Sequence, residues 1–526
     1  MKKSRTVNTI YNFTTGIFGQ IVNIVMQFIV RTVFIQTLGK SYLGINGLFS
    51  NILSMMSLAE LGVGSAILFK LYKPLAADNR PRITALMNFY KKVYSAIGIV
   101  VLIIGLCLIP FLPNLVKDYG KLATLGINAV FIYLLYLMET VSSYLFFAYK
   151  SAIIKANQQE YIVNTVQFIF KTIFSVVQII ILLVFKNFEL YVATLVINII
   201  AQNFVISKIA NRQYPYIQEK TSENIEKKEV KEIFKDCSSL VLYKMNSVVL
   251  SATDNIIISV FLGLEMVGLY SNYLIFYTTI KTILNRIFGS VAHSLGNLHA
   301  SNKIDYEYKI FKSINLISAI LGATAFVGIF CVADEFIGIW LGKDWIIVQP
   351  FAFLLGIEIY SLSMRLFFGR YRSAMGLFQQ AKYRPVVGMI INLIVSLVLV
   401  QYWGIYGVVI GTIVADWSTL MWYDPVIIHK YGFKNRFPVK KYFLKNLMFI
   451  ILTTLLGGVN YFICNNFIIN NELISLILHA GICAIVVPVV FVIVFRKQEE
   501  TQILVDTLKS IINRVKMKFK KKGLKE

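Results

Sequence analysis

Fourteen long apolar segments follow one another along this chain, and they constrain its fold more than any other feature. A helix that crosses the hydrocarbon core of a bilayer needs about 20 mostly apolar residues. The chain has 526 residues with a mean hydropathy of +0.67, and only 15% of them are charged, so nearly all of it is expected to lie in the membrane. We predict an all-α integral membrane protein with transmembrane helices at 9–37, 43–70, 89–113, 122–149, 158–185, 189–207, 236–262, 266–299, 310–333, 346–369, 384–401, 405–428, 443–463 and 473–495.

The positive charge is distributed very unevenly over the connections between these helices. If the N-terminus is cytoplasmic, the inner connections and the two ends of the chain hold 41 of the 52 Lys and Arg residues. The outer connections hold only five, Lys40, Lys117, Lys121, Lys186 and Lys343. Cytoplasmic loops of membrane proteins are enriched in Lys and Arg, and one missed helix would reverse the bias after it. The pattern therefore predicts fourteen spans with both termini in the cytoplasm, and it accounts for the net charge of +25 without nucleic acid.

The first and seventh spans are related by a shift of 224 residues. The shift carries a polar stripe from one apolar helix to another, namely Gln20, Asn23, Gln27 and Arg31 onto Lys244, Ser247, Ser251 and Asn255. It also carries Leu38-Gly39 and Gly44 onto Leu262-Gly263 and Gly268. The chain is therefore predicted to contain two related halves, and such repeats in transporters place the transport pathway between them.

Charged side chains remain inside the predicted spans, where they are costly and mark transport pathways by default. Those that sit in polar rows well inside a span are expected to line one cavity as substrate-binding cations: Arg31, Lys171, Lys244 and Lys281. Further residues could line the cavity or couple it to an ion: Asn23, Gln27, Glu60, Asp254, Asn255, Tyr277, Arg286 and Arg365.

Some of these residues have a purely structural alternative. Glu358 and Arg365 lie about two turns apart on one helix and could belong to a charge network. Glu139 and Asp416 could neutralise a lysine of a neighbouring helix, and Arg286 could reach the cytoplasmic interface. Ser and Asn rows also join membrane helices without any transport role.

Several cations in each half favour an anionic ligand. Lys and Arg bind phosphate oxygens, and tyrosines such as those of the eighth span could pack against sugar faces. The five cysteines and four histidines are scattered, with no CxxC motif, so no metal site is expected. Nucleotide-binding and catalytic patterns are also missing from the sequence, so no cofactor is expected and an enzyme is not predicted.

The segment from Arg31 to Ile45 resembles the opening of the Wzx-type polysaccharide flippases, together with Ala59-Glu60-Leu61-Gly62 and the small residues that follow. That family reads Arg, then Leu-Gly and Tyr-Gly, then an acidic residue with Leu-Gly. Here Leu43 separates the Tyr from the Gly. By position, Arg31 matches the motif arginine and Glu60 the motif acid. The second repeat, with Asp254-Asn255 and Leu262-Gly263, is similar to that family's seventh and eighth helices.

The resemblance implies the multidrug/oligosaccharidyl-lipid/polysaccharide exporter superfamily, with two six-helix lobes around a central cavity and two further C-terminal helices. We expect an N-lobe at 1–207, a cytoplasmic linker at 208–235, a C-lobe at 236–430, helices 13 and 14 at 441–496 and a basic amphipathic cytoplasmic tail at 497–526. The implied substrate is an undecaprenyl-pyrophosphate-linked oligosaccharide repeat unit. It would be flipped across the bacterial cytoplasmic (inner) membrane for capsule, O-antigen or exopolysaccharide assembly.

Other readings stay open within the same chemistry. A flippase for lipid II or a teichoic-acid precursor would need nearly the same cavity, and a multidrug exporter of the same superfamily would favour acids in it. A major facilitator normally carries a Gly-x-x-x-Asp-Arg signature after helix 2, whereas 70–82 contains no glycine. A polymerase or ligase would need a substantial outer loop. The expected partners are the lipid-linked glycan, membrane lipids, a polysaccharide polymerase and a coupling H⁺ or Na⁺.

Overall fold

The structure is a computed structural model of the whole chain. It describes residues 5–56, 63–117, 119–124, 126–219, 221, 223, 225–226, 228–231, 252–301, 303–466, 470–506 and 509. These residues form helices and no strand, as the sequence predicts. By contacts the chain divides into two compact units, Met1–Gly268 and Leu269–Glu526, which are described separately.

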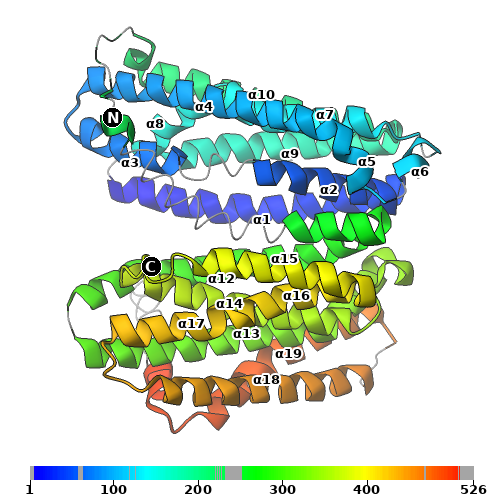
Figure 1. Cartoon of the computed structure of the whole chain (residues 1–526), viewed down its shortest axis with the longest axis vertical. Coiled ribbons are helices and arrows are strands. Elements are labelled where there is room, and N and C mark those ends of the chain that lie inside the picture. Colours follow the sequence, from blue (N-terminus) through cyan, green and yellow to red (C-terminus); the bar gives the residue numbers. More distant parts are fainter. Residues whose placement is uncertain are drawn as a thin grey trace, which may run out of the picture. The chain divides into compact units, whose positions relative to one another are not determined.

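The first unit is a bundle of helices that run side by side (Figure 1). Besides its α-helices it has short 3-10 turns, Ile109–Phe111, Ala148–Lys150 and Pro215–Gln218. A further helix covers Ala252–Leu262. Its α-helices are α1 Arg5–Leu38, α2 Lys40–Met56, α3 Val63–Ala76, α4 Arg80–Leu108, α5 Leu112–Leu115, α6 Tyr119–Thr124, α7 Ala129–Leu145, α8 Ser151–Ala156, α9 Glu160–Val184 and α10 Phe188–Gln213.

The second unit is built around α13, which packs against α14, α18 and α19, while α15 packs against α16. A 3-10 turn at Lys343–Trp345 and a π-helical turn at Ile428–Gly432 complete it. Its helices are α12 Leu264–Ala300, of which the first turn belongs to the first unit, α13 Ile304–Leu341, α14 Phe351–Ala374, α15 Arg384–Trp403, α16 Ile405–Ser418, α17 Leu420–Ile427, α18 Val439–Asn466 and α19 Glu472–Val494.

Each predicted span overlaps a helix, and the chain is a multi-pass membrane protein. Within the described residues nine helices are long and apolar enough to cross a bilayer, or ten if the bent pair Ala129–Leu145 and Ala148–Ala156 is one span. The count of fourteen stays a prediction. Several predicted ends differ from the helix ends, as at α7, which begins at Ala129 and not near 122 because Gly126 has a positive φ of 71° and the Asn128 side chain caps the helix.

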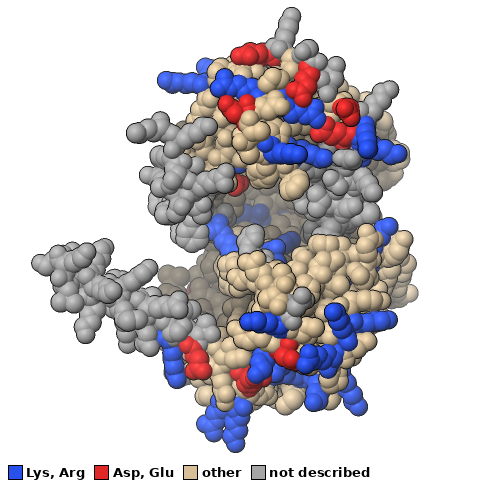
Figure 2. All heavy atoms as spheres, turned by 90° about the vertical axis from the view of Figure 1, so that its left-hand side faces the viewer, with Lys and Arg blue, Asp and Glu red and all other residues tan. Residues whose placement is uncertain are grey.

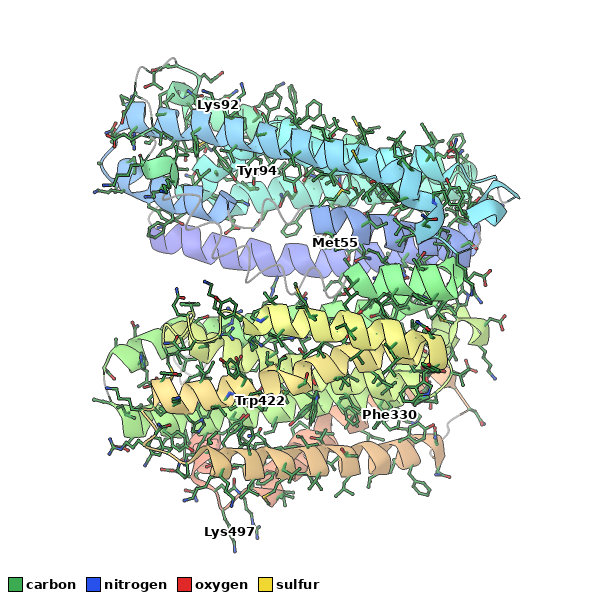
Figure 3. All side chains as sticks on the ribbon, in the orientation of Figure 1. Met55, Lys92, Tyr94, Phe330, Trp422 and Lys497 are labelled. Atoms are coloured by element: carbon green, nitrogen blue, oxygen red, sulfur yellow. The ribbon has the colours of Figure 1, made fainter. Side chains whose placement is uncertain are left out.

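The outward-facing side chains of the helices are apolar along most of the helix length, and charged side chains gather at one end. Ile451, Leu455 and Ile485 on α18 and α19 are more than half exposed, as expected for side chains that face lipid. Figure 3 labels Lys92 on α4 and Lys497, which lies in the turn after α19 and points away from the second unit. Figure 2 shows one end of each unit, where Lys and Arg gather with some acids. At this end of the second unit, hydrogen bonds from Lys309 and Lys312 lower the pKa of the Glu499 carboxyl.

The 224-residue repeat is visible in the backbone of the first unit. Gly39, between α1 and α2, and Gly263, between 252–262 and α12, both have positive φ, 87° and 95°. Only glycine adopts this conformation without strain. A Cβ on Gly44 would lie 2.0 Å from the Leu264 carbonyl oxygen, and a Cβ on Gly268 would lie 2.6 Å from that of Lys40. Lys40 and Leu264 are themselves related by the shift, so equivalent segments of the two repeats pack against each other.

This packing explains why the first unit extends beyond the predicted linker at 208–235. Ser259 donates a hydrogen bond to the carbonyl oxygen of Leu115, and the Lys117 ammonium donates to that of Phe261. These contacts join 252–262 to the α5 region. By contacts, the described residues 252–268 therefore cluster with the first unit, and the predicted lobe boundaries stay a prediction.

Candidate functional site

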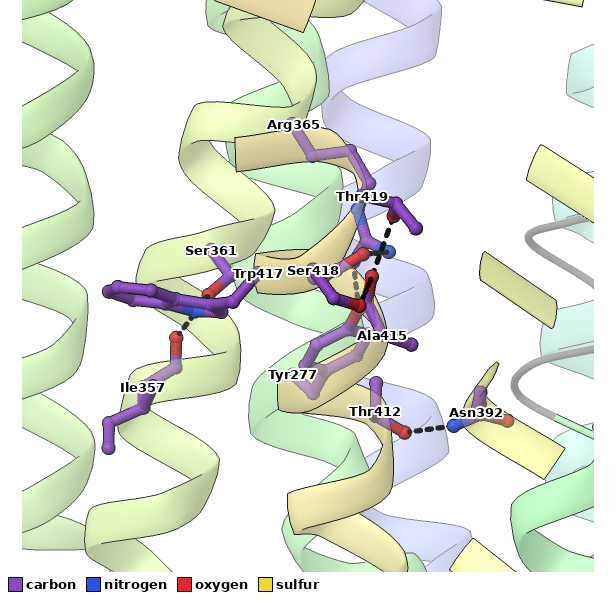
Figure 4. A network of polar contacts seen from close by, with 11 residues as sticks. Tyr277, Ile357, Ser361, Arg365, Asn392, Thr412, Ala415, Trp417, Ser418 and Thr419 are labelled. Carbon is purple, nitrogen blue, oxygen red and sulfur yellow. Dashed lines mark hydrogen bonds and ion pairs between the residues drawn. The ribbon is translucent and has the colours of Figure 1, made fainter. Parts of the chain in front are cut away.

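Charged and phenolic groups from three helices meet inside the second unit. Arg365 on α14 pairs with Asp416 on α16, with 3.3 Å between Nη1 and Oδ1. Its Nη2 donates a hydrogen bond of 3.1 Å to the hydroxyl of Tyr277 on α12. Figure 4 shows Arg365 reaching down toward Tyr277 beside α16. Asp416 and Tyr277 are buried, so the arginine is held in a mostly protein environment.

Two more ionisable groups complete this cluster, which we call the Arg365 network. The Lys281 ammonium lies 5.9 Å from the centroid of the Tyr277 ring. Glu358, two turns before Arg365 on α14, is buried and interacts electrostatically with Arg365, Asp416 and Lys281. The network thus contains two cations and two carboxylates. The structural alternative for Glu358 and Arg365, one charge network, fits this arrangement.

Close helix packing fixes the network in place. A Cβ on Gly411 would lie 2.1 Å from Ser396 Oγ, so glycine is needed for the close approach of α16 to α15. Asn392 on α15 donates a hydrogen bond of 2.9 Å to Thr412 on α16 (Figure 4). Trp417 donates one of 2.9 Å to Ser361 on α14. These contacts hold α14, α15 and α16 as one body around the Arg365–Asp416 pair.

The other tyrosines of the predicted eighth span do not offer free faces to a ligand. Tyr270 and Tyr273 are buried against Phe351, with ring centroids 6.1 and 4.9 Å away. The Tyr273 hydroxyl donates a hydrogen bond of 2.5 Å to Asp334. The Tyr273 hydroxyl thus has the hydrogen-bond partner that a buried phenol usually finds. That tyrosines of this span pack against sugar faces stays a prediction.

In the first unit, Arg31 lies near the end of α1 in an aromatic surrounding. Phe34, one turn further on, packs edge-on against Phe188 and Tyr191 of α10, and Arg31 interacts electrostatically with Tyr191. Arg31 is partly buried, as is Asn23, whereas Gln27 is exposed. On the neighbouring α7, the Tyr136 hydroxyl donates a hydrogen bond of 2.5 Å to Asn46 of α2.

Lys171 on α9 lies at a different level from Arg31. A Cβ on Gly19 of α1 would overlap the Phe168 ring of α9, and Phe34 meets the start of α10, which directly follows α9. The two helices therefore run parallel, and Arg31 lies about nine residues further along the bundle than Lys171, roughly 13 Å at 1.5 Å per residue. The structure gives Lys171 no ion pair with any residue that it describes. Further along α9, Gln178 donates a hydrogen bond to Thr194 of α10, so this part of the polar row joins two helices.

The remaining predicted site residues are placed as follows. Asp254 and Asn255 are buried in the helix 252–262 of the first unit, and Arg286 on α12 is exposed. Lys244 and Glu60 lie outside the described residues. The structure therefore brings Lys281, Tyr277 and Arg365 together, and the shared cavity of Arg31, Lys171, Lys244 and Lys281 stays a prediction.

A second buried ion cluster was missed by the sequence analysis. Arg372 on α14 lies 3.0 Å from Asp424 on α17, and Arg384 at the start of α15 lies 3.3 Å from the same carboxylate. Arg372 and Asp424 are 1% and 0% exposed. Both arginines counted as inner-loop charges in the sequence. The available signal was Asp424 itself, an acid within the apolar span 405–428.

Three of the scattered cysteines also come together. The sulfur atoms of Cys331, Cys464 and Cys483, from α13, α18 and α19, all lie within 4.8 Å of one another. The sequence-based expectation of isolated cysteines is wrong for these three. Their positions in the chain give no regular spacing from which this could have been inferred.

Comparisons of the sequence with known proteins found a family model and a relative. Residues 132–350 match a family model described as polysaccharide biosynthesis protein. A stretch of 188 residues is 26% identical to the probable low-salt glycan biosynthesis flippase Agl15 of Haloferax volcanii. It covers 34% of this chain and 39% of that protein, so the match spans about two fifths of the relative's length.

Solved structures show the fold. The lipid II flippase MurJ in an inward closed conformation matches with a TM-score of 0.65 and 15% identity over 94% of this chain and 99% of that one. An inward-facing MATE multidrug transporter of the MOP superfamily matches with a TM-score of 0.58 and 12% identity over 79% and 96%. The chain has the fold of this superfamily, and the resemblance to polysaccharide flippases read from the sequence is confirmed.

Proposed function

We propose that this protein is a flippase that carries undecaprenyl-pyrophosphate-linked oligosaccharide repeat units from the inner to the outer leaflet of the bacterial cytoplasmic membrane. The product would enter capsule, O-antigen or exopolysaccharide assembly, where a polysaccharide polymerase would use it. The fold shared with a lipid II flippase and the match to a glycan flippase support a lipid-linked glycan as the class of substrate.

One observation carries the choice of an anionic substrate. Lys171 is a partly buried lysine within an apolar helix, and the described residues supply it with no carboxylate. An ammonium group is expensive in such a position unless it is paired. A pyrophosphate would supply the missing negative charge, and Lys binds phosphate oxygens as a point charge.

The membrane potential gives this substrate a direction. A potential of 100 mV, negative inside, is worth about 2.3 kcal/mol for each charge that crosses it. A pyrophosphate with roughly two negative charges gains a few kcal/mol on the way outward, less whatever a co-transported cation neutralises. We propose Asp416 and Glu358 as the acids at which a coupling H⁺ or Na⁺ would act, because they share the Arg365 network with the cavity candidate Lys281.

The direct test uses Arg31, the residue that also matches the family motif. In a strain that lacks its own flippase, surface polysaccharide should be partly retained with Arg31→Lys and lost with Arg31→Ala and Arg31→Glu. Lysine keeps the charge and loses only the bidentate geometry. Membrane abundance of each variant controls for folding, and Arg286→Ala, an exposed cation, should export normally. Full export by a well-expressed Arg31→Ala protein would refute the proposed role.

A lipid II or teichoic-acid precursor flippase is the second candidate, and the structural match to MurJ favours it. The two functions share the anion and differ in the glycan. Complementation separates them: rescue of surface polysaccharide in one strain, or of growth in a strain depleted of its lipid II flippase. Drug export is the third possibility, since the matched MATE transporter is described as a multidrug resistance transporter. It would be measured as drug resistance of the host strain that does not depend on Arg31.

A further inference from the structure

Three thiol groups from three helices of the second unit meet at one point. Cys331 lies on α13, Cys464 near the last turn of α18 and Cys483 in the middle of α19. Their sulfur atoms lie within 4.8 Å of one another; Cys464 and Cys483 are buried and Cys331 is half-buried. Of the four cysteines that the structure describes, only Cys107 on α4 is elsewhere, and it is exposed.

We propose that these three cysteines bind one soft, closed-shell metal ion, of which Zn(II) and Cu(I) are the biological candidates. Thiolate ligands select such ions over hard cations such as Mg²⁺. With zinc–sulfur bonds of about 2.3 Å, three ligating sulfurs stand roughly 4 Å apart, which the observed cluster allows without moving a helix. Each thiol that binds releases its proton to water.

A histidine–carboxylate pair lies one helical turn from the thiols. His479 Nδ1 is 2.7 Å from Glu335 Oε2, and His479 precedes Cys483 by four residues on α19 as Glu335 follows Cys331 by four on α13. A histidine whose second nitrogen is held by a carboxylate is the usual form of a metal-ligating histidine. The ring nitrogens of His479 lie outside the group of ligand atoms within 4.8 Å, so the structure supplies three thiolates. Three thiolates alone suit Cu(I), and a four-coordinate Zn(II) site would need the His479 side chain to turn toward the ion as the fourth ligand.

An ion could reach the three thiols from a neighbouring cleft, and its binding would link three helices. A cleft of about 220 Å³ borders it, lined by Cys483 with Ala480 and Ala484 on α19 and by residues of α12 and α13. An ion bound here would link α13 to both C-terminal helices, α18 and α19. The alternative is that the three cysteines only pack as small apolar side chains.

Metal content of the purified full-length protein tests the proposal. The protein is prepared in detergent with a phosphine reductant and no chelator, titrated with Zn²⁺ or Cu⁺ against a chromophoric competitor, and assayed by elemental mass spectrometry. We expect one ion per chain, and at least tenfold weaker binding for each of Cys331→Ser, Cys464→Ser and Cys483→Ser. Cys107→Ser is the matched control and should bind like the parent. His479→Gln should weaken Zn²⁺ by about 10–100-fold and leave Cu⁺ little changed.

X-ray absorption on the loaded, unmodified protein gives a readout that does not depend on whether a variant folds. Three sulfur neighbours at about 2.3 Å support the proposal, with one nitrogen in addition for Zn(II). Fewer than two sulfurs, an ion content equal to that of the triple Cys→Ser variant, or a disulfide among these cysteines without metal would each overturn it. None of these outcomes depends on the substrate that is transported.

Discussion

Two cations inside predicted membrane spans, Arg365 of the second unit and Lys171 of the first, differ in their described partners. In the second unit, Arg365 is held by Asp416 and Tyr277 from two other helices, with Glu358 on its own helix nearby. In the first unit, Lys171 has no ion pair within the described residues, and its row on α9 otherwise consists of neutral polar groups. The charge of Arg365 is balanced within its own unit, whereas Lys171 has no carboxylate partner among the residues that the structure describes.

The difference suggests separate roles for the two cations: Arg365 stabilises the fold, and Lys171 binds a ligand. A cation that is paired across helices holds those helices together, so its removal should be felt in folding. A cation without an internal partner contributes little to the fold and is by default a candidate for ligand binding.

The largest effect is expected from breaking the pair of the second unit. Asp416→Leu leaves the Arg365 guanidinium without its carboxylate in a mostly buried position, which typically costs about 3–5 kcal/mol of unfolding free energy. The double variant Arg365→Met, Asp416→Leu should recover most of that loss, because it removes both charges. Thermal unfolding in detergent measures both. If Asp416→Leu were as stable as the parent, the pair would not hold the helices together.

The next effect concerns Lys171, which has no ion pair with any described residue of the first unit. Lys171→Gln should therefore leave the melting temperature nearly unchanged and reduce export by roughly 10–100-fold. The expected fall in export follows from losing one hydrogen bond to a charged group, which contributes about 1.5–3 kcal/mol. Surface polysaccharide per transporter is the measurement, and Gln178→Leu, which breaks only the contact with Thr194, is the control for disturbance of α9. A large loss of stability with normal export would reverse the comparison.

A smaller effect should follow from giving Lys171 an internal partner. Gln167 lies four residues before it on the same face of α9 and is exposed. Gln167→Glu creates a pair in the favourable order, worth about 0.2–0.5 kcal/mol in an isolated helix. The new carboxylate competes with the anionic substrate, so export should fall by roughly tenfold while stability is kept. Gln167→Met is the neutral control. Unchanged export in Gln167→Glu would show that Lys171 does not meet the anion.

The sequence predicted what depends on one helix at a time. Apolar length predicted the helices, the repeat paired Gly39 with Gly263, and polar or charged residues inside apolar spans identified Lys281, Tyr277 and Arg365 as candidates. Helix ends were less accurate where a local cap decides them, as at Asn128.

Contacts between helices could not be predicted in the same way. Asp416 and Cys331 occur as single residues in apolar segments, and nothing within those segments indicates which neighbour they meet. The same holds for Arg372 and Arg384, whose positions after a span look like loop charges until Asp424 of α17 is placed between them. The partner of a buried group is set by helix packing, which a single sequence does not specify.

The smallest effect on export and stability is expected from replacing Arg286. This variant tests whether the position of a cation on α12 matters, or only the presence of its charge. It lies on α12 five residues after Lys281, so it is on a different side of the helix, and it is exposed where Lys281 is partly buried. A cation that can reach the interface loses little when it is removed, and surface substitutions usually change stability by less than about 0.5 kcal/mol. Arg286→Ala should therefore match the parent in both melting temperature and export, whereas Lys281→Ala should lose export. Equal losses of export from the two variants would mean that export responds to the total charge of α12. The position of each cation, and whether it is paired, would then not explain its role in export.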